Sequence, residues 1–234
     1  MTAPRGAPRR CPVVTIDGPS GSGKGTISRA IARHVGWHLL DSGALYRLVA
    51  VAGALAGAAQ DDAAAHAGLA ARMAVDFGAG ADEEERILLD GRDVTAQVRS
   101  EAAGQGASRV AAWPQVRQAL LARQRAFARP PGLIADGRDM GTVIFPGADL
   151  KIFLTASTQE RALRRHKQLK DKGSDVSLPA LSREIAERDR RDETREVAPL
   201  KAAPDACVID STALTVDEVV GRVLQMMGAR RLWP

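Results

Sequence analysis

Short runs of apolar residues alternate along this chain with longer segments in which apolar residues recur every three or four positions. The short runs are typical of strands buried on both faces of a sheet, and the longer segments of the helices that cover it. Five runs have the length and composition of such strands, at residues 13–16, 37–41, 132–136, 150–155 and 206–210. The alternation predicts βαβ units, and hence an α/β fold with a five-stranded parallel sheet between helical layers.

Two regions depart from this alternation. Residues 72–98 contain two β-like runs, AVDF and RILLD, separated by a polar, glycine-rich stretch. This pattern predicts a local hairpin, so we expect a small antiparallel β insert at about residues 70–100, with the acidic run 82–85 as its solvated turn. Residues 157–195 form two highly charged helical patterns with few large apolar residues. Such a segment is more suited to move over a site than to fill a core, and we expect a mobile helical lid there.

The composition fits one globular domain. The chain has 234 residues, of which 45% are hydrophobic and 26% charged, and we expect a disordered basic tail at residues 1–12 and a single domain over 13–234. No apolar run approaches the ~20 residues of a membrane span, so we expect no membrane partner. The two cysteines lack the spacing of a metal site or a disulfide framework, which favours a cytoplasmic location. The ordinary surface composition suggests a monomer.

The net charge of +5 favours anionic partners. Among the 33 basic residues only six are lysine. The planar guanidinium of arginine holds phosphate through two parallel hydrogen bonds, although biased codon use would give the same excess. A nucleic-acid-binding surface would interleave arginine with exposed aromatic residues that stack on bases. Aromatic residues are 3% of the chain and are not interleaved in this way, so we expect no nucleic-acid partner.

The sequence GPSGSGKG at residues 18–25 matches the phosphate-binding pattern G-x-x-x-x-G-K, after an apolar strand and before a helix. Backbone N–H groups, the helix N-terminus and Lys24 would hold phosphates there. Gly25 stands where this pattern usually has Ser or Thr, so direct Mg²⁺ ligation by the loop is in doubt, and the Mg²⁺ ligands stay unknown. Thr26 is expected to bond a phosphate. The expected ATP-binding residues are Gly18, Pro19, Ser20, Gly21, Ser22, Gly23, Lys24, Gly25 and Thr26.

The loop alone does not say where the phosphate goes. The chain has no asparagine, which excludes the guanine-reading Asn-Lys-x-Asp motif of regulatory GTPases, and it has no H-R-D catalytic loop of a protein kinase. A small-molecule kinase remains. Within that class the acceptor could be a nucleotide or a metabolite alcohol, and a catalytically silent nucleotide sensor is the third alternative.

Four further segments make a more specific match: LDSGALYR (40–47), VAAWPQVRQALLARQRAF (110–127), IADGRDMGTVIFPGADLKIFLTAS (134–157), and ERDRRDETREVAPL (187–200) with VIDST (208–212). In this order, from about Val13 to Val220, they resemble the bacterial cytidylate kinases, members of the nucleoside monophosphate kinase family. The resemblance implies a P-loop three-layer fold with a β insert on the acceptor side and a helical lid. It also implies direct transfer of the γ-phosphoryl group of ATP, bound with Mg²⁺, to CMP or dCMP.

The resemblance further assigns residue roles. It implies a catalytic set of Lys24, Arg138, Arg188 and Arg195, and contact with ATP from Arg164 in the lid. The CMP-binding residues that it implies are Ser42, Tyr46, Arg47, Ser108, Arg117, Arg138, Asp139, Arg188, Asp192 and Arg195. Among them, Asp139 would accept from the cytosine amino group, where uracil instead offers an oxygen.

Several of these residues also have a structural interpretation. Tyr46 could equally be core, and Arg117 a solvated helix arginine. We expect Asp189, Arg190 and Arg191 to be exposed. The spacing i, i+3 and i+7 places Arg188, Arg191 and Arg195 on one helical face. Asp136 could lie near Mg²⁺ or cap the next turn.

Overall fold

The computed structural model describes residues 11–79, 85–171, 173 and 176–233. The chain forms two compact units, which are described separately below. Unit 1 comprises residues 1–40, 125–189 and 200–234, and unit 2 comprises residues 41–124 and 190–199. Most of the predicted N-terminal tail and of the predicted acidic turn lies outside the described residues.

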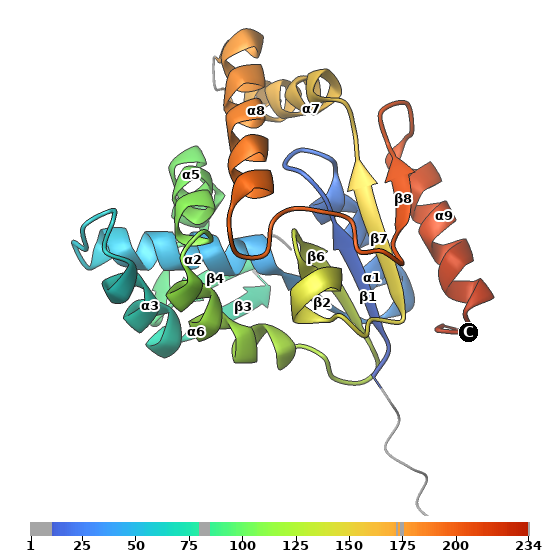
Figure 1. Ribbon diagram of the computed structural model, residues 1–234, viewed down its shortest axis with the longest axis horizontal. Coiled ribbons are helices and arrows are strands. Elements are labelled where there is room, and N and C mark those ends of the chain that lie inside the picture. The colour runs from blue at the N-terminus through green and yellow to red at the C-terminus, as the bar shows by residue number, and fades with distance from the viewer. Residues whose placement is uncertain (1–10, 80–84, 172, 174–175, 234) are drawn as a thin grey trace, which may run out of the picture. The chain divides into compact units, whose positions relative to one another are not determined.

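Unit 1 is built on a five-stranded parallel sheet with the order β2-β6-β1-β7-β8 (Figure 1). The strands are β1 (Val13–Asp17), β2 (His38–Asp41), β6 (Leu133–Gly137), β7 (Leu150–Thr155) and β8 (Cys207–Asp210). All five strands predicted from the apolar runs are confirmed. Because β1 lies between β6 and β7, the segments that leave these three strands begin at the same edge of the sheet, where α/β folds bind ligands.

The helices of unit 1 are α1 (Lys24–Val35), α7 (Thr158–Asp171), α9 (Val216–Ala229), the π-helical turn η1 (Met140–Ile144) and α8 (Leu178–Thr194), which continues into unit 2 after Asp189. Helices α1 and α9 cover the same face of the sheet, where their apolar residues form one core with Val14 and Ile16 of β1. In the part of the chain that is described, no helix is both long and apolar enough to cross a membrane.

Side chains alternate along β1, so Thr15 and Asp17 point to the face opposite Val14 and Ile16. On that opposite face η1 packs closely against the strand. A Cβ atom on Gly141 would lie 2.8 Å from Thr15 Oγ1, closer than such atoms approach one another. Glycine at position 141 therefore lets η1 lie directly on β1.

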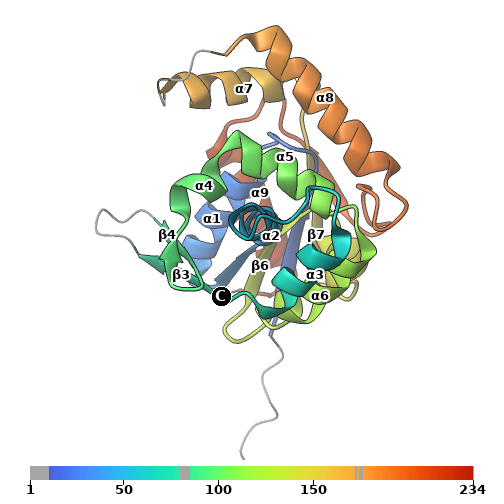
Figure 2. The same ribbon diagram turned by 90° about the vertical axis from the view of Figure 1, so that its left-hand side faces the viewer.

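Unit 2 consists of helices and a small sheet. Helix α2 (Ser42–Leu55) contacts three others, and Figure 2 shows it nearly end-on among them. The other helices are α3 (Ala63–Arg72), α4 (Thr95–Arg99), α5 (Glu101–Val110) and α6 (Pro114–Arg125). Helix α2 makes its most extensive contact with α5, where a Cβ atom on Gly106 would lie only 2.7 Å from Ala50 Cβ.

The small sheet of unit 2 has the order β3-β4-β5, with β3 (Val75–Ala79), β4 (Glu85–Leu89) and β5 (Arg92–Asp93) paired antiparallel. The predicted hairpin is thereby confirmed as part of a three-stranded insert. The triplet Asp76-Phe77-Gly78 has the letters of a protein-kinase D-F-G motif, but it lies within β3 and pairs with β4. Its position in a hairpin is unlike that of a kinase loop.

The core of unit 1 gives a stability prediction. Val14→Ala, on the fully buried β1, should lower the free energy of unfolding by about 2–3 kcal/mol, because two methyl groups leave a cavity behind. The matched control is Val208→Ala on β8 of the same sheet, where the side chain is 63% exposed and the effect should stay within about 0.5 kcal/mol. Urea unfolding measures both. Equal losses would contradict the assignment of the core to the α1 and α9 face.

Candidate active site

The phosphate-binding loop leaves β1 in a conformation that requires glycine. Gly18 has a φ of 151°, and a Cβ atom there would lie 1.9 Å from the carbonyl oxygen of Leu154 on the neighbouring strand. Gly23 has a φ of 94° and is the N-cap of α1. The sequence thus turns the chain from β1 into α1 within six residues, 18–23, and directs the N-terminus of α1 toward the loop.

Lys24 lies folded back across this loop and is 5% exposed. Its Nζ donates to the carbonyl oxygen of Pro19 at 2.8 Å and to Ser22 Oγ at 3.5 Å. Burial lowers the pKa of Lys24 well below its ordinary value, and the positive charges of Arg138 and Arg188 lower it further, against the opposing carboxylates of Asp136 and Asp17. Lys24, Arg138 and Arg188 of unit 1 are therefore close enough for their charges to interact, and this arrangement favours binding of an anion.

Asp17, the last residue of β1, was missed by the sequence analysis. Its carboxylate is 4% exposed and accepts from the backbone N–H groups of Met140 and Gly141, each at 2.8 Å. Burial is the main cause that raises the pKa of Asp17 to about 6, and the nearby Asp139 adds to it. An aspartate that ends an apolar strand gives no further signal in the sequence, because its partners are more than 100 residues away.

The predicted residues Arg138 and Asp139 lie between β6 and η1. Asp139 is 2% exposed and is the N-cap residue of η1. Arg138 is half-buried, and its Nη1 donates to the carbonyl oxygen of Gly137 at 3.2 Å. Both residues belong to unit 1, together with the phosphate-binding loop.

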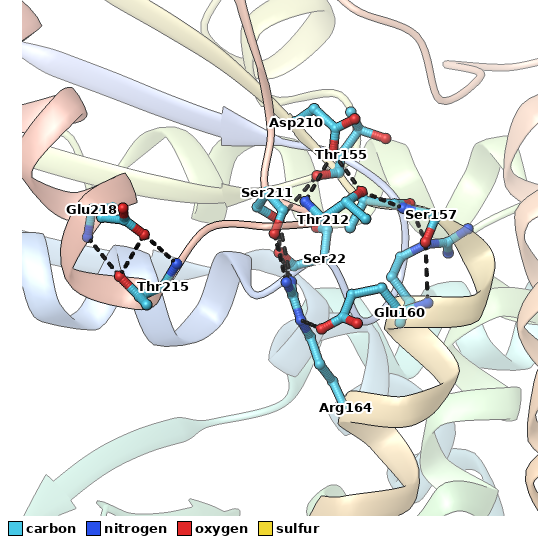
Figure 3. Close-up of polar contacts among 12 residues, drawn as sticks. Ser22, Thr155, Ser157, Glu160, Arg164, Asp210, Ser211, Thr212, Thr215 and Glu218 are labelled. Carbon is cyan, nitrogen blue, oxygen red and sulfur yellow. Dashed lines mark hydrogen bonds and ion pairs between the residues drawn. The ribbon is translucent and has the colours of Figure 1, made fainter.

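Arg164 of α7 is bonded within unit 1 to the loop and to the end of β8 (Figure 3). Its Nε donates to Glu160 at 2.8 Å, one helical turn earlier. Its two terminal nitrogens donate to the carbonyl oxygens of Ser22 and Ser211, at 3.4 and 2.6 Å, and to Ser211 Oγ at 3.2 Å. The side chain therefore joins α7 to the phosphate-binding loop, and its contact with ATP stays a prediction.

A second arginine of α7, Arg161, pairs with a residue that the sequence predicted to be exposed. Arg161 is 4% exposed, donates to the carbonyl oxygen of Ser20 in the loop at 3.0 Å, and forms an ion pair of 2.6 Å with Asp189 of α8. The prediction that Asp189 is exposed was wrong. The signal was present in the sequence, since Leu181, Ile185 and Asp189 recur every four positions and share the buried stripe of α8.

Unit 2 contains the predicted site residues that lie on α2 and α6. Arg117 is 7% exposed and its guanidinium lies 5.8 Å from the centre of the Tyr46 ring, itself buried. The interpretation of Arg117 as a solvated helix arginine is therefore wrong. Arg47 donates through Nη1 to the carbonyl oxygens of Val98 and Ser100, each at 2.9 Å. Ser42, at the start of α2, is also buried.

Ser108 and Asp192 are brought together within unit 2. Ser108 Oγ donates to Asp192 Oδ1 at 3.5 Å and accepts from Arg191 at 3.0 Å. The prediction that Arg191 is merely an exposed charge was therefore wrong, while Arg190 is exposed as predicted. The helical face predicted for Arg195 was also wrong, because α8 ends at Thr194 and the Arg195 Nε donates to the carbonyl oxygen of Ala198 in the following turn.

The described residues contain no cluster of three or more His, Cys, Asp or Glu side chains that could hold a metal ion. One carboxylate does lie beside the loop. A Cβ atom on Gly25 would be 3.4 Å from Asp136 Oδ2, at the end of β6, and Asp136 is 7% exposed. This donor set fits Mg²⁺ that keeps several waters and takes other ligands from a phosphate chain.

The chain is similar to several known proteins. A family model described as cytidylate kinase matches residues 14–229. A protein named cytidylate kinase from Aeromonas salmonicida is 56% identical over 217 residues, which are 93% of this chain and 94% of that protein. Another of that name, from Methylococcus capsulatus, is 58% identical over 209 residues, or 89% and 93% of the two chains. The solved structure of an uncharacterized protein from Eubacterium ventriosum shares the fold, with a TM-score of 0.50 and 10% identity over 93% of this chain and 98% of that one.

The buried pair of Arg161 and Asp189 gives a second prediction. Asp189→Ala should lower the free energy of unfolding by about 3–5 kcal/mol, because the buried guanidinium loses its counter-charge. The control is Arg190→Ala, the next residue along α8, which is exposed and should change stability by at most about 0.5 kcal/mol. Guanidinium unfolding followed by circular dichroism compares them. A negligible effect of Asp189→Ala would mean that the pair is solvated in solution.

Proposed function

Because the chain belongs to the cytidylate kinase family, we propose that it transfers the γ-phosphoryl group of MgATP to CMP or dCMP, giving CDP or dCDP. The observation that carries this proposal is the buried Lys24 of the phosphate-binding loop, whose pKa is lowered first by burial and then by the charges of Arg138 and Arg188. A second anion beside the ATP phosphates would be stabilised by these arginines. Their sequence segments are those that resemble the acceptor-binding motifs of the family.

On the donor side, we assign ATP to the loop at residues 18–26. Backbone N–H groups at the start of α1 and the Lys24 ammonium would neutralise the phosphate chain. Arg164 supports the loop from α7 through the carbonyl oxygen of Ser22. We propose that it lies close enough to the bound nucleotide to contact it.

On the acceptor side, the proposal takes its residues from the family resemblance. Arg47, Arg138, Arg188 and Arg195 would bind the phosphate of CMP. Asp192 would meet the ribose, beside Tyr46 and Ser42. The cytosine ring would be recognised by Ser108, Arg117 and Asp139, and a carboxylate at Asp139 selects the amino group of cytosine over the oxygen of uracil.

The mechanism follows from charge and position. The phosphate of CMP is already an anion near neutral pH, so its oxygen can attack the γ-phosphorus without a strong general base, and no covalent enzyme intermediate is needed. The obstacle is the approach of two anions. Lys24, Arg138, Arg188 and Arg195 would offset this repulsion and hold attacking and leaving oxygens in line.

Mg²⁺ would accompany ATP, with Asp136 as a carboxylate beside the loop at Gly25. Thr26 would bond a phosphate. When bound, the ion would neutralise charge that develops on the transferring phosphate. A lid of α7 and α8 would exclude water from ATP and so prevent its wasteful hydrolysis. The mobility of this lid, a monomeric state and a cytoplasmic location stay predictions.

An acceptor panel tests the proposed function. ADP release from MgATP should depend on CMP or dCMP and should be far slower with UMP, AMP, GMP or no acceptor. Activity with UMP alone would point to a different base recognition. Release without any acceptor, or none with any nucleotide, would favour a kinase of another metabolite or a nucleotide sensor and would remove the acceptor assignments.

Arg188→Ala tests the charge that carries the proposal. It should lower kcat by about 10³-fold or more, since an arginine that stabilises a transferring phosphoryl group has an effect of that order. The control is Arg183→Ala, an exposed arginine earlier in α8, which should keep the wild-type kcat. Circular dichroism would establish that both variants are folded. Wild-type turnover in Arg188→Ala would exclude this residue from the reaction.

A further inference from the structure

Asp17 connects two segments that the proposed function treats separately. It is the last residue of β1 and directly precedes Gly18 of the phosphate-binding loop. Its two carboxylate oxygens each accept one backbone N–H, from Met140 and from Gly141, at 2.8 Å. Asp139 directly precedes these two residues. The buried carboxylate of Asp17 therefore attaches the backbone that follows Asp139 to the end of β1.

The contact between β1 and η1 is close over more than one residue. Thr15 lies on the same face of β1 as Asp17, and a Cβ atom on Gly141 would be 2.8 Å from Thr15 Oγ1. Asp17 also lies in register with Gly137 of β6, the residue before Arg138. The segment 137–141 is therefore attached to β1 by strand pairing at Gly137 and by the two hydrogen bonds that Asp17 accepts from Met140 and Gly141.

We propose that Asp17 is a positioning residue, whose carboxylate fixes the 139–141 backbone against β1 and so sets the place of Asp139 relative to the phosphate-binding loop. The inference rests on the proposed function, in which Asp139 recognises cytosine. Its consequence is that Asp17 governs the binding and selection of CMP without touching the nucleotide. A role in folding alone would lower stability and leave the choice of acceptor unchanged.

The negative charge of Asp17 strengthens the two hydrogen bonds that its carboxylate accepts. Both bonds are accepted by the ionised carboxylate, and a protonated carboxyl group accepts only weakly through its hydroxyl oxygen. Burial and the charge of Asp139 raise the pKa of Asp17 to about 6, while Lys24 opposes them. The residues in register on either side, Gly137 of β6 and Phe153 of β7, are uncharged. Below pH about 6, protonated Asp17 in the wild-type chain should therefore weaken one of its hydrogen bonds to the 140–141 backbone, as asparagine would at the same position.

The experiment compares wild type with Asp17→Asn, which keeps the shape of the side chain but offers one acceptor fewer and removes the charge. At pH 8 the KM for CMP should rise about tenfold and the preference for CMP over UMP should fall by a similar factor, as expected for loss of one charge-assisted hydrogen bond. The KM for ATP should stay within about twofold. Equal changes in both KM values would place the effect in the loop and overturn the proposal.

The pH dependence gives a sharper readout. The ratio of kcat/KM for CMP between wild type and Asp17→Asn cancels the ionisation of the CMP phosphate itself. The ratio should be about ten at pH 8 and should approach one as the pH falls through about 6, because protonated Asp17 resembles asparagine. A ratio that does not change with pH would overturn the proposal. The matched control is Asp149→Asn, which removes a carboxylate that accepts from the Val13 N–H at the other end of β1, and its ratio should stay near one throughout.

A second pair of variants covers the case in which Asp17→Asn does not fold. Gly141→Ala pushes η1 away from Thr15 without altering the loop, and it should likewise raise the KM for CMP and leave that for ATP unchanged. The new methyl group would also lie 3.1 Å from Cδ of the Lys151 side chain, which is flexible and can shift. Adding Thr15→Ala removes the closer contact, with Thr15 Oγ1, and should restore the KM for CMP. An unchanged KM for CMP in Gly141→Ala would contradict the proposal. Wild-type turnover of CMP tests the proposed function separately, since it does not depend on any of these variants.

Discussion

The buried ammonium group of Lys24 is the constraint on which the site depends. Removing a charge from water is unfavourable unless the surroundings compensate for it, and within the loop Lys24 has only the carbonyl oxygen of Pro19 and the hydroxyl of Ser22 at hydrogen-bonding distance. The charges of Arg138 and Arg188 add repulsion. The carboxylates of Asp136 and Asp17 offset part of this repulsion, and a bound polyanion would offset more of it.

The arginine excess has a structural component that composition did not reveal. In unit 1, Arg161 and Arg164 donate to backbone carbonyl oxygens of the loop, and in unit 2 Arg47 and Arg117 donate to carbonyl oxygens at helix ends. A guanidinium group has five donors in a fixed plane and can satisfy several carbonyl groups at once, whereas a lysine ammonium cannot bridge them in the same way. Arginines of this chain thus hold the backbone in place, and Arg47, Arg117 and Arg164 do so at positions that the proposed function also assigns to nucleotide binding.

Local patterns in the sequence predicted the sheet, the insert and the loop, because strands, hairpins and glycine turns depend on residues close together in the chain. The bonds of Asp17 to Met140 and of Arg161 to Ser20 could not be predicted in this way, since each joins residues more than 120 positions apart. The burial of Asp189 could be predicted only in part from the sequence. Its spacing from Ile185 indicated the buried face of α8, but its charge suggested solvent, and only the partner Arg161 explains why a carboxylate is stable there.

The order in which the chain is synthesised has a consequence for the loop. Residues 18–25 are synthesised well before residues 164 and 211, yet Ser22 accepts hydrogen bonds from Arg164 and Ser211, and Ser211 follows the last strand of the sheet. The apolar face under the loop is likewise closed by α9 near the C-terminus. A nascent or prematurely terminated chain therefore carries the whole nucleotide motif without the support that shapes it. The ability to hold a nucleotide should therefore appear only after β8 and α9 have left the ribosome.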